Sequence, residues 1–576
     1  MKKIYLPILL LTLAVSSCDT FDKVPSSEWP SEGAIKTLED LQFAVNGVYE
    51  SQTSSIDAGT NPRGSYAGDF FLYADQRGSD FKAIGSNKQT VDVYAYQATK
   101  NSSDSYYFYK RFYLSLARIN KVLEGVKKSG LEGAEVDVQV GELYALRALF
   151  HFDLARLFAK LPCNAQASDP GIVLSTEVFE SGYTAERATI AKTYETILDD
   201  LKTALDNLPE TSKVVTAGHI DYWGARALRA RAYLYMNENS KALEDAKYVI
   251  EKSPYKLYTR DEYETVWTKV GSSESIFEFL ITSLYNAQRN SLGFYTHAEG
   301  YAEAGITEGF KTFLQERPED VRSTLIAEES DGGDNEGWYI QKYPGRDGEI
   351  YVNNPKVIRL SEVYLIAAEA ALKAGGADPA SYINDLRKQR IADYEDVASV
   401  TIDDILTERR LELYGEGHNA WDTWRNKKAV TNAQVPAGPI NYDDYRTVMP
   451  IPVSEINVSN GKLKQNEGYK YTETILITSP FNFKQLNGLA FYFPFPNLHM
   501  SVILSVPPHN TDFYLQIPLS PSLTISANIG FAPLTKHSTA ITIRINPIKR
   551  IITLFPVSPS TFTSRVEARR IKNVSR

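Results

Sequence analysis

Cysteine is almost absent from this chain, which carries only Cys18 and Cys163 among 576 residues. Cys18 ends an N-terminal leader, so an exported mature chain has no intramolecular disulfide and depends on its apolar core. The seven histidines are scattered and never paired at metal-site spacing. A glycine-rich phosphate loop and a recognisable Ser or Cys nucleophile motif are also missing. We therefore expect no enzyme, no cofactor and no metal.

The chain also lacks an apolar run long enough to span a bilayer as a helix. Its longest run, residues 4–15, follows Lys2 and Lys3, which is the pattern of a secretory signal peptide. The run ends in Val15-Ser16-Ser17-Cys18, which resembles the lipobox that bacterial signal peptidases cut. We predict that residues 1–17 are removed and that Cys18 is lipidated. The alternative is a soluble secreted protein in which Cys18 has no role.

Acidic residues nearly disappear from the last part of the chain. Residues 475–576 contain 10 Lys and Arg but only Asp512 and Glu567, whereas the whole chain has 71 acidic and 62 basic residues. This segment also holds 11 of the 27 prolines and none of the six tryptophans. Dense proline prevents long helices and interrupts central strands. We predict that 475–576 is irregular or disordered and foreign to the main fold, through read-through, frameshift or gene-model error. The alternative is an appended β-domain, supported by the alternating residues 539–545.

Helical periodicity dominates the preceding residues. Stretches rich in Ala, Leu and Tyr, closed by Pro or Gly, predict helices at 106–128, 140–160, 190–208, 221–237, 240–252, 357–374 and 402–414. Two long polar and aromatic segments, 51–101 and 256–354, lie between them. We expect a mainly α fold, in which these segments form loops and short elements packed on a helical frame. The net charge of −9 offers no basic surface for nucleic acid.

One helix pair fits the 34-residue spacing of a tetratricopeptide repeat. With Pro254 as the closing proline, five residues occupy the packing positions at which small side chains let two helices approach: Ala230, Tyr233, Ala242, Ala246 and Val249. Ala246 departs from the aromatic residue preferred there. The spacing alone also suits any alanine-rich helical hairpin.

Residues 408–425 read ERRLELYGEGHNAWDTWR and resemble the signature of the SusD/RagB family of Bacteroidetes outer-membrane lipoproteins. His418 stands where relatives more often carry arginine or lysine. Other family elements follow the same order along residues 18–470, among them GELYALRA at 141–148, Arg359 with Glu362, MPIP at 449–452 and QNEGY at 465–469. The last of these normally lies close to a family member's terminus. The resemblance therefore places a SusD-like domain at 18–474.

The resemblance implies a tetratricopeptide-like frame and a surface lipoprotein that captures glycans. Such proteins cap a SusC-like TonB-dependent transporter in the outer membrane. Their glycan site is formed by loops corresponding to 51–101 and 256–354, whereas the repeat helices face the transporter. Alternatives of other classes are a binder of peptides or other nutrients, and a structural adaptor of the transporter complex.

Candidate binding residues come from these two loop segments. A sugar presents a C–H face and a rim of hydroxyls, so its sites combine an aromatic platform with polar partners. One loop supplies Tyr73, Asp75, Arg77 and Asp80, and the other supplies Tyr285, Asn286, Tyr295, Tyr301 and Trp338. For each aromatic the competing interpretation is a loop anchor packed on the frame.

The charged residues of the signature segment invite a catalytic interpretation. Their spacing, however, suits ion pairs along and between helices. We predict a structural role for these residues: Glu408, Arg409, Arg410, Glu412, Glu416, Asp422 and Arg425.

Overall fold

The computed structural model describes residues 34–469, except 55–62, 86–88, 181, 211–217, 433–434 and 436–437, together with six strands between 490 and 554. The predicted leader and Cys18 lie outside the described residues. The chain divides into two compact units, Met1–Lys470 and Tyr471–Arg576. This division falls close to the composition boundary at Thr474.

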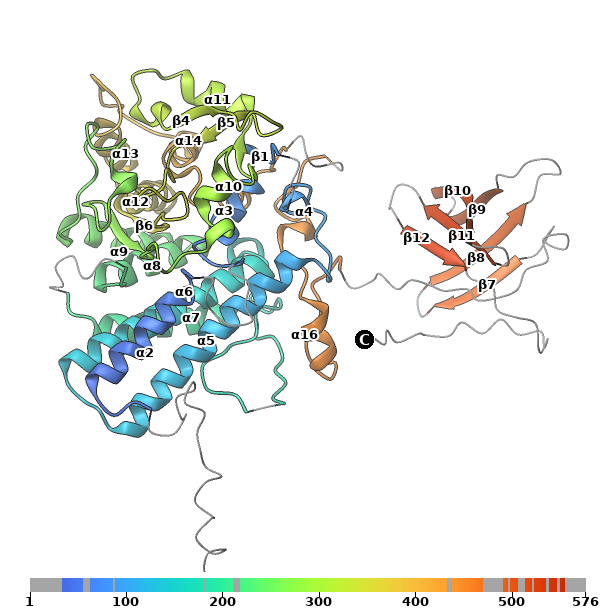
Figure 1. Ribbon diagram of the computed structural model, residues 1–576, viewed down its shortest axis with the longest axis horizontal. Coiled ribbons are helices and arrows are strands. Elements are labelled where there is room, and N and C mark those ends of the chain that lie inside the picture. Colours follow the sequence, from blue (N-terminus) through green and yellow to red (C-terminus); the bar gives the residue numbers. More distant parts are fainter. Residues whose placement is uncertain are drawn as a thin grey trace, which may run out of the picture. The chain divides into compact units, whose positions relative to one another are not determined.

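Long helices build the frame of the first unit (Figure 1). They are α2 (Leu38–Glu50), α5 (Ser103–Ser129), α6 (Ala134–Phe158), α7 (Ile190–Asn207), α8 (Tyr222–Tyr235), α9 (Asn239–Lys252), α12 (Leu360–Ala374), α13 (Pro379–Lys388) and α14 (Ile402–Leu413). Shorter helices are α3 (Asp69–Gln76), α4 (Val91–Tyr94), α10 (Leu292–Thr296), α11 (Glu308–Gln315), α15 (Asn419–Arg425) and α16 (Val453–Val458). Single 3-10 turns occur at Pro162–Asn164, Val266–Thr268, Gln288–Asn290, Val321–Thr324 and Tyr445–Thr447.

Local sequence explains where the helices begin and end. The side chain of Thr401 accepts a hydrogen bond from the backbone N–H of Asp404, whose carboxylate accepts in return, so a capping box starts α14. Gly130 ends α5 in the left-handed region at φ 68°, a conformation that glycine adopts without steric cost. All seven predicted helices are present. The largest shift is at α6, which begins at Ala134, six residues before the predicted start, and the other ends differ by three residues or fewer. Residues 357–359, predicted as helix, belong to strand β6 (Lys356–Arg359) before α12 begins.

The predicted repeat pair is α8 and α9. Ala230, Ala242, Ala246 and Val249 are completely buried, and Tyr233 packs partly buried against the core. Small side chains at these positions allow the two helices to approach closely. The structure therefore confirms the helical-hairpin packing that the spacing predicted.

Helix α6 forms the centre of the core. Every residue from Leu143 to Phe158 except Tyr144 is buried, and α5 and α7 pack against it. Shortening Leu146 or Leu149 to alanine would remove a fully buried side chain, a change that typically costs about 2–5 kcal/mol.

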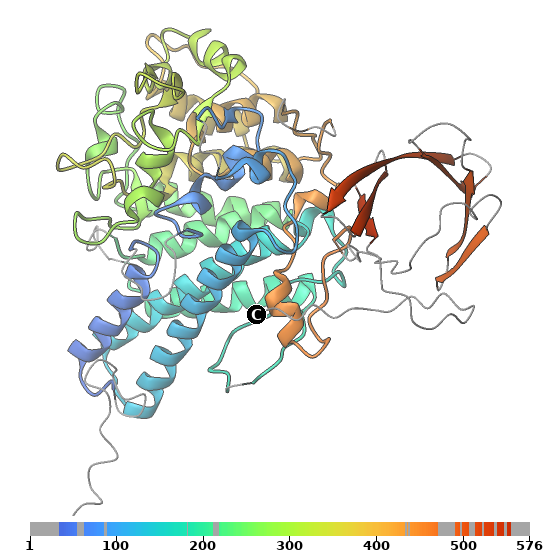
Figure 2. The same ribbon diagram turned by 45° about the vertical axis from the view of Figure 1, so that its right-hand side comes forward.

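The short elements of the two loop segments, which we name the loop layer, lie together at the end of the frame opposite to the end where α2 begins and α5 ends (Figures 1 and 2). Strand β1 (Phe81–Lys82) from the first segment pairs with β3 (Gly305–Ile306) from the second. The sheet order is β1-β3-β5-β4, with β4 at Ile326–Glu329 and β5 at Gly337–Ile340. A second small sheet pairs β2 (Ser275–Glu278) with β6. Short elements packed on a helical frame were predicted, and they are found.

The second unit contains an antiparallel sheet in the order β12-β11-β10-β9-β8-β7. Its strands are β7 (Ala490–Phe495), β8 (Leu498–Ser505), β9 (Phe513–Ser520), β10 (Leu523–Leu534), β11 (Ser538–Ile545) and β12 (Arg550–Leu554). Irregular or disordered structure was predicted for 475–576, and for these strands that prediction is wrong. Pro494 lies on the edge strand, and Pro518 pairs beside an irregularity in the register; both are positions where a sheet tolerates proline. Strand β11 contains the alternating residues 539–545.

Candidate functional site

The signature segment lies in a network of buried ion pairs. Arg359 binds Glu412 at 2.9 Å and Glu416 at 2.7 Å, and Arg390 binds Glu412 at 3.0 Å. Arg322 binds the other carboxylate oxygen of Glu412 at 3.2 Å. Although burial alone would raise the pKa of Glu412, Arg390, Arg359 and Arg322 hold it well below its usual value. The carboxylate is therefore charged and fully paired.

A second buried network joins α12, α14 and α15. Arg425 binds Glu369 and Asp422, and Arg409 binds Asp422 at 2.7 Å. Burial would raise the pKa of Glu369, but Arg425, which also donates hydrogen bonds, holds it far below its usual value. Both networks connect elements that are distant in sequence, so they confirm the structural role predicted for the charged residues of the signature.

The first group of candidate binding residues is buried. Tyr73, Asp75, Arg77 and Asp80 are each at most 3% exposed. Asp75 accepts a hydrogen bond from the backbone N–H of Gly417, and burial raises the pKa of Asp75 to about 8. Asp80 accepts from Arg410 Nε at 2.8 Å.

These contacts fasten the end of α3 and the turn after it to residues 410–419. A buried side chain cannot offer an open face to a sugar ring. The prediction of these four residues as an exposed glycan site is therefore corrected. They are loop anchors, as the competing interpretation proposed.

The second group is divided between core and surface. Tyr295 is completely buried and Asn286 is 6% exposed, with its amide donating to Thr282 and Ser283 carbonyl oxygens. Tyr285 is 40% exposed, and Tyr301 and Trp338 are partly exposed. Tyr295 and Asn286 therefore cannot form part of an open sugar-binding surface. Tyr285, Tyr301 and Trp338 are exposed enough to do so.

Tyr301 belongs to a cluster of partly exposed rings that we name the aromatic platform: Phe294, Tyr301 and Tyr351. The ring centroids of Phe294 and Tyr301 are 4.7 Å apart, and those of Phe294 and Tyr351 are 5.7 Å apart. All three side chains are partly exposed. The rings come from α10, the turn after it and the 341–355 loop.

Close backbone approach explains how the aromatic platform is assembled. A Cβ on Gly293 would lie 2.1 Å from the carbonyl oxygen of Ile350, and one on Gly300 would lie 2.0 Å from that of Phe294. Ala302, next to Tyr301, has a φ of 53°, a left-handed conformation that costs an L-residue energy and often accompanies functional sites. Only glycine at 293 and 300 permits this arrangement.

Tyr285 and Trp338 do not belong to the aromatic platform. The loop carrying Tyr285 is anchored by Ile281 and Ala287, which pack on Val352 directly after Tyr351. Trp338 is partly exposed on β5, next to the buried Tyr339. The Lys311 ammonium lies 4.4 Å from the Trp338 ring centre. Trp338 therefore forms a separate aromatic position. Phe294 and Tyr351 were missed from sequence, although both lie in the second loop segment.

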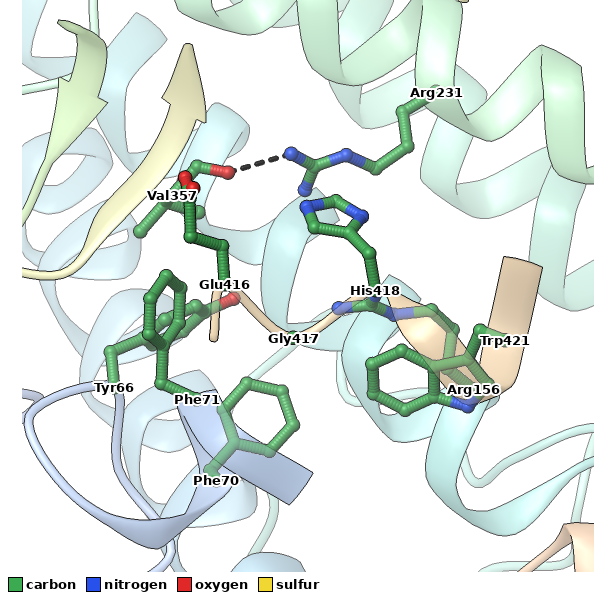
Figure 3. Close-up of a pocket in the computed structure, with 10 residues that line it drawn as sticks. All are labelled: Tyr66, Phe70, Phe71, Arg156, Arg231, Val357, Glu416, Gly417, His418 and Trp421. Carbon is green, nitrogen blue, oxygen red and sulfur yellow. Dashed lines mark hydrogen bonds between the residues drawn. The ribbon is translucent and has the colours of Figure 1, made fainter. Parts of the chain in front are cut away.

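Two internal cavities in the described part of the chain are too small for a sugar. Each has a volume of about 10 Å³, room for about one water molecule. Figure 3 shows the first, where the His418 imidazole lies among Arg231, Arg156 and Trp421. Burial, with Arg231, Arg409 and Arg156, holds the pKa of His418 well below its usual value despite Glu362. This histidine is neutral and enclosed, so an extended ligand requires an open face such as the aromatic platform.

Within the described ranges no group of three His, Cys, Asp or Glu residues could hold a metal ion. In the same residues no helix combines the length and apolar character needed to cross a membrane.

Comparison with known proteins decides the family. A crystal structure of a SusD superfamily protein from Bacteroides thetaiotaomicron VPI-5482 is 30% identical, with a TM-score of 0.69, covering 75% of this chain and 99% of the other. The chain belongs to the SusD family. The SusD family profile matches residues 319–469, and a profile described as "Starch-binding associating with outer membrane" matches residues 30–234.

Two further SusD relatives extend the comparison. SusD-like protein P2 of Formosa agariphila is 23% identical over 534 residues, covering 81% of this chain and all of the relative. A laminarin-binding SusD-like protein is 22% identical, with a TM-score of 0.62, covering 76% of this chain and all of the other. The similarity to the laminarin-binding protein shows the fold alone. The SusD fold predicted from the signature is thus confirmed, and the matches to solved structures leave about a quarter of the chain uncovered.

Proposed function

We propose that this SusD family member is a surface lipoprotein that binds glycan nutrients and delivers them to a SusC-like TonB-dependent transporter. The observation that carries the proposal is the aromatic platform within the loop layer of a SusD fold. Phe294, Tyr301 and Tyr351 are partly exposed and contiguous. Family membership and the signal-like residues before Cys18 support the outer-membrane location and lipid anchor.

The chemistry of the aromatic platform suits a carbohydrate. Aromatic faces pack against the C–H faces of sugar rings, and nearby amides and charged groups can bind hydroxyls. Arg346, which is partly exposed, lies in the same loop, and its guanidinium is held by the amide oxygen of the buried Asn354 at 3.3 Å. An open face accommodates a chain of sugars, which the two small cavities cannot.

The printed descriptions of two relatives select the first probes. One neighbour is named as laminarin-binding, and one matching profile is named as starch-binding. We therefore choose laminarin and soluble starch, with xylan and pectin as further members of the panel.

Affinity electrophoresis of the full chain in gels containing each polysaccharide tests the proposal. We expect retarded migration in at least one gel and no release of reducing sugar during incubation. Release of reducing ends would instead identify an enzyme. Migration unchanged in every gel would contradict glycan capture for the panel, and binding of a peptide mixture by calorimetry would then favour the peptide alternative. Co-purification with the transporter without any nutrient binding would favour the adaptor.

A further inference from the structure

The imidazole of His297 connects separate parts of the second loop segment. Its Nδ1 lies 2.8 Å from the Glu329 carboxylate, and its Nε2 lies 2.9 Å from the carbonyl oxygen of Tyr343. The side chain of His297 is only 12% exposed. Both ring nitrogens therefore form hydrogen bonds within the protein.

The two partners of the ring can only accept hydrogen bonds. A main-chain carbonyl oxygen, such as that of Tyr343, carries no hydrogen to donate. The Glu329 carboxylate also accepts from the side-chain amide of Gln341 at 2.7 Å and from the backbone N–H of Ala298 at 3.0 Å. Burial would raise the pKa of Glu329, but the hydrogen bond and the charge of His297 hold it below its usual value. Glu329 is therefore an ionised carboxylate.

These contacts determine the protonation state of the ring. A neutral imidazole has one N–H donor and one nitrogen with a free lone pair. In that form the lone pair of His297 would face an oxygen lone pair at 2.8 or 2.9 Å. Only the imidazolium, which has two N–H donors, satisfies both acceptors. The observed geometry is therefore that of a charged histidine.

His297 lies in the turn that assembles the aromatic platform. It stands between Phe294 and Tyr301, where the backbone N–H of Tyr301 donates to the Phe294 carbonyl oxygen at 2.7 Å. Its partner Tyr343 lies in the loop that carries Tyr351. The imidazole therefore joins the two chain segments that supply all three rings of the aromatic platform.

The charged and titratable groups around the imidazole come from several elements. Glu329 on β4 touches it, Asp331 follows in the same hairpin, and Glu299 is exposed to solvent, where its charge is screened. Burial, with Glu329 and Asp331, raises the pKa of Tyr339 on β5 above its usual value, and burial raises that of Tyr343 further. Both tyrosines are therefore neutral. Histidine is the side chain that ordinarily changes its charge near neutral pH, so a pH change in this range acts on the ring itself.

We propose that His297 is a positioning residue that holds the aromatic platform in its binding geometry while the imidazole is charged. Loss of one proton removes one of the two hydrogen bonds and leaves two lone pairs facing each other. The link between the turn with Phe294 and Tyr301 and the loop with Tyr351 is then weakened. Glycan affinity is therefore greatest in acid and falls as pH rises. The affinity part of this inference rests on the proposed glycan function, whereas the hold on the two segments does not.

Amide hydrogen exchange of the full chain measures this hold without any glycan. At about pH 5.5, peptides covering 294–301 and 343–351 should exchange more slowly in the wild-type protein than in His297→Gln, which cannot carry the charge. At about pH 8.5 the two proteins should exchange alike. Comparison at each pH cancels groups common to both proteins, such as Lys342, whose pKa burial lowers to about 8. Equal exchange of the two proteins in acid would overturn the proposal.

Calorimetric titration with the polysaccharide that retards the wild-type protein measures affinity over the same pH range. Wild-type affinity should fall about tenfold from acid to alkaline pH, as for one lost hydrogen bond to a charged group, and His297→Gln should bind weakly throughout. His219→Gln is the matched control and should keep the wild-type pH profile, because His219 also pairs with a carboxylate, Glu142 at 2.7 Å, but lies on the helical frame.

The two measurements separate this inference from the proposed function. Wild-type affinity that does not change with pH, or a pH dependence that persists in His297→Gln, would overturn the role of His297. Slow exchange of the two segments in acid, with no polysaccharide bound at any pH, would instead refute glycan binding and support the hold by His297.

Discussion

Replacing Glu412 with glutamine tests the structural role of the signature segment. Glu412 is completely buried and binds Arg322, Arg359 and Arg390. Glutamine keeps the shape of the side chain and removes its charge. Breaking a buried ion pair by removing one partner typically costs about 3–5 kcal/mol.

The remaining contacts place the expected loss at the lower end of this range. Arg359 and Arg390 still bind Glu274, and Arg322 still binds Asp320 and Glu408. We therefore expect a loss of about 3 kcal/mol in the free energy of unfolding. For a unit of this size such a loss lowers the melting temperature by roughly 3 °C, because an unfolding entropy of about 2 cal/mol/K per residue makes each kcal/mol worth about 1 °C.

Circular dichroism melting curves and guanidinium titrations of the full chain measure this loss. The matched control is Asp403→Asn, which removes one partner of the exposed pair with Lys428, whose side chains are 71% and 45% exposed. Exposed pairs contribute about 0–1 kcal/mol, so the control should melt close to wild type. A Glu412→Gln variant as stable as the control would refute the structural interpretation.

The stability difference between the wild-type protein and Glu412→Gln should also depend on pH in a definite direction. The folded-state pKa of Glu412 lies well below its ordinary value. Its contribution to stability is therefore complete above the unfolded pKa, about 4.3, and is lost as pH falls through the folded value. The stability difference between wild type and Glu412→Gln should be largest near neutral pH and should narrow in acid.

Three further predictions concern the tail, Asp75 and the anchor. Truncation after Lys470 should leave the melting temperature of the first unit unchanged in circular dichroism, and a large decrease would show that the tail belongs to the core. Burial raises the folded pKa of Asp75 to about 8, so its ionisation removes stability as pH rises from about 4 to 8. Asp75→Asn should therefore melt at or above the wild-type temperature at pH 8, and a lower value would show a required charge. Cys18→Ala should move the protein from the membrane fraction to the soluble fraction, and retention in the membrane would contradict lipidation.

Helical periodicity was the most informative part of the sequence. It predicted α5 to α9 because apolar residues repeat at helical spacing and capping residues bound the segments. It also assigned 357–359 to a helix, whereas these residues belong to strand β6, which pairs with β2. Pairing between segments distant in sequence is a tertiary effect that a local pattern cannot contain.

Burial of polar residues limited the site prediction. Tyr73, Asp75 and Arg77 have the residue types of a sugar site, but the contacts that bury them come from Gly417, Trp424 and Arg446, hundreds of residues away. Phe294 and Tyr351 do not lie in any sequence motif that would have marked them as binding residues. Their proximity depends on Gly293 and Gly300, whose role becomes visible only when the packed backbone atoms are known.

The β-strands of the second unit show what composition alone cannot predict. Proline density argued against strands at 475–576, yet Pro494 and Pro518 occupy an edge strand and an irregular register position. The number of prolines in a segment does not tell at which positions of a sheet they lie. Composition therefore could not distinguish a disordered segment from a sheet whose edge and irregular positions hold the prolines. That the segment is foreign to the main fold stays a prediction.

Affinity electrophoresis of platform variants tests the central claim most directly. In a gel containing the polysaccharide that retards the wild-type protein, Tyr301→Ala and Tyr351→Ala should migrate almost unretarded. Their melting temperatures should change little, because truncating a partly exposed ring opens no enclosed cavity. Tyr183→Ala, at an exposed ring outside the loop layer, is the control and should remain retarded.

The buried Tyr73 gives the opposite expectation in the same assay. Tyr73→Ala should lower the melting temperature by several degrees, since loss of a buried aromatic side chain costs about 3–5 kcal/mol, while its folded fraction remains retarded. Undiminished retardation of both Tyr301→Ala and Tyr351→Ala would contradict the assignment of the aromatic platform as the glycan-binding face.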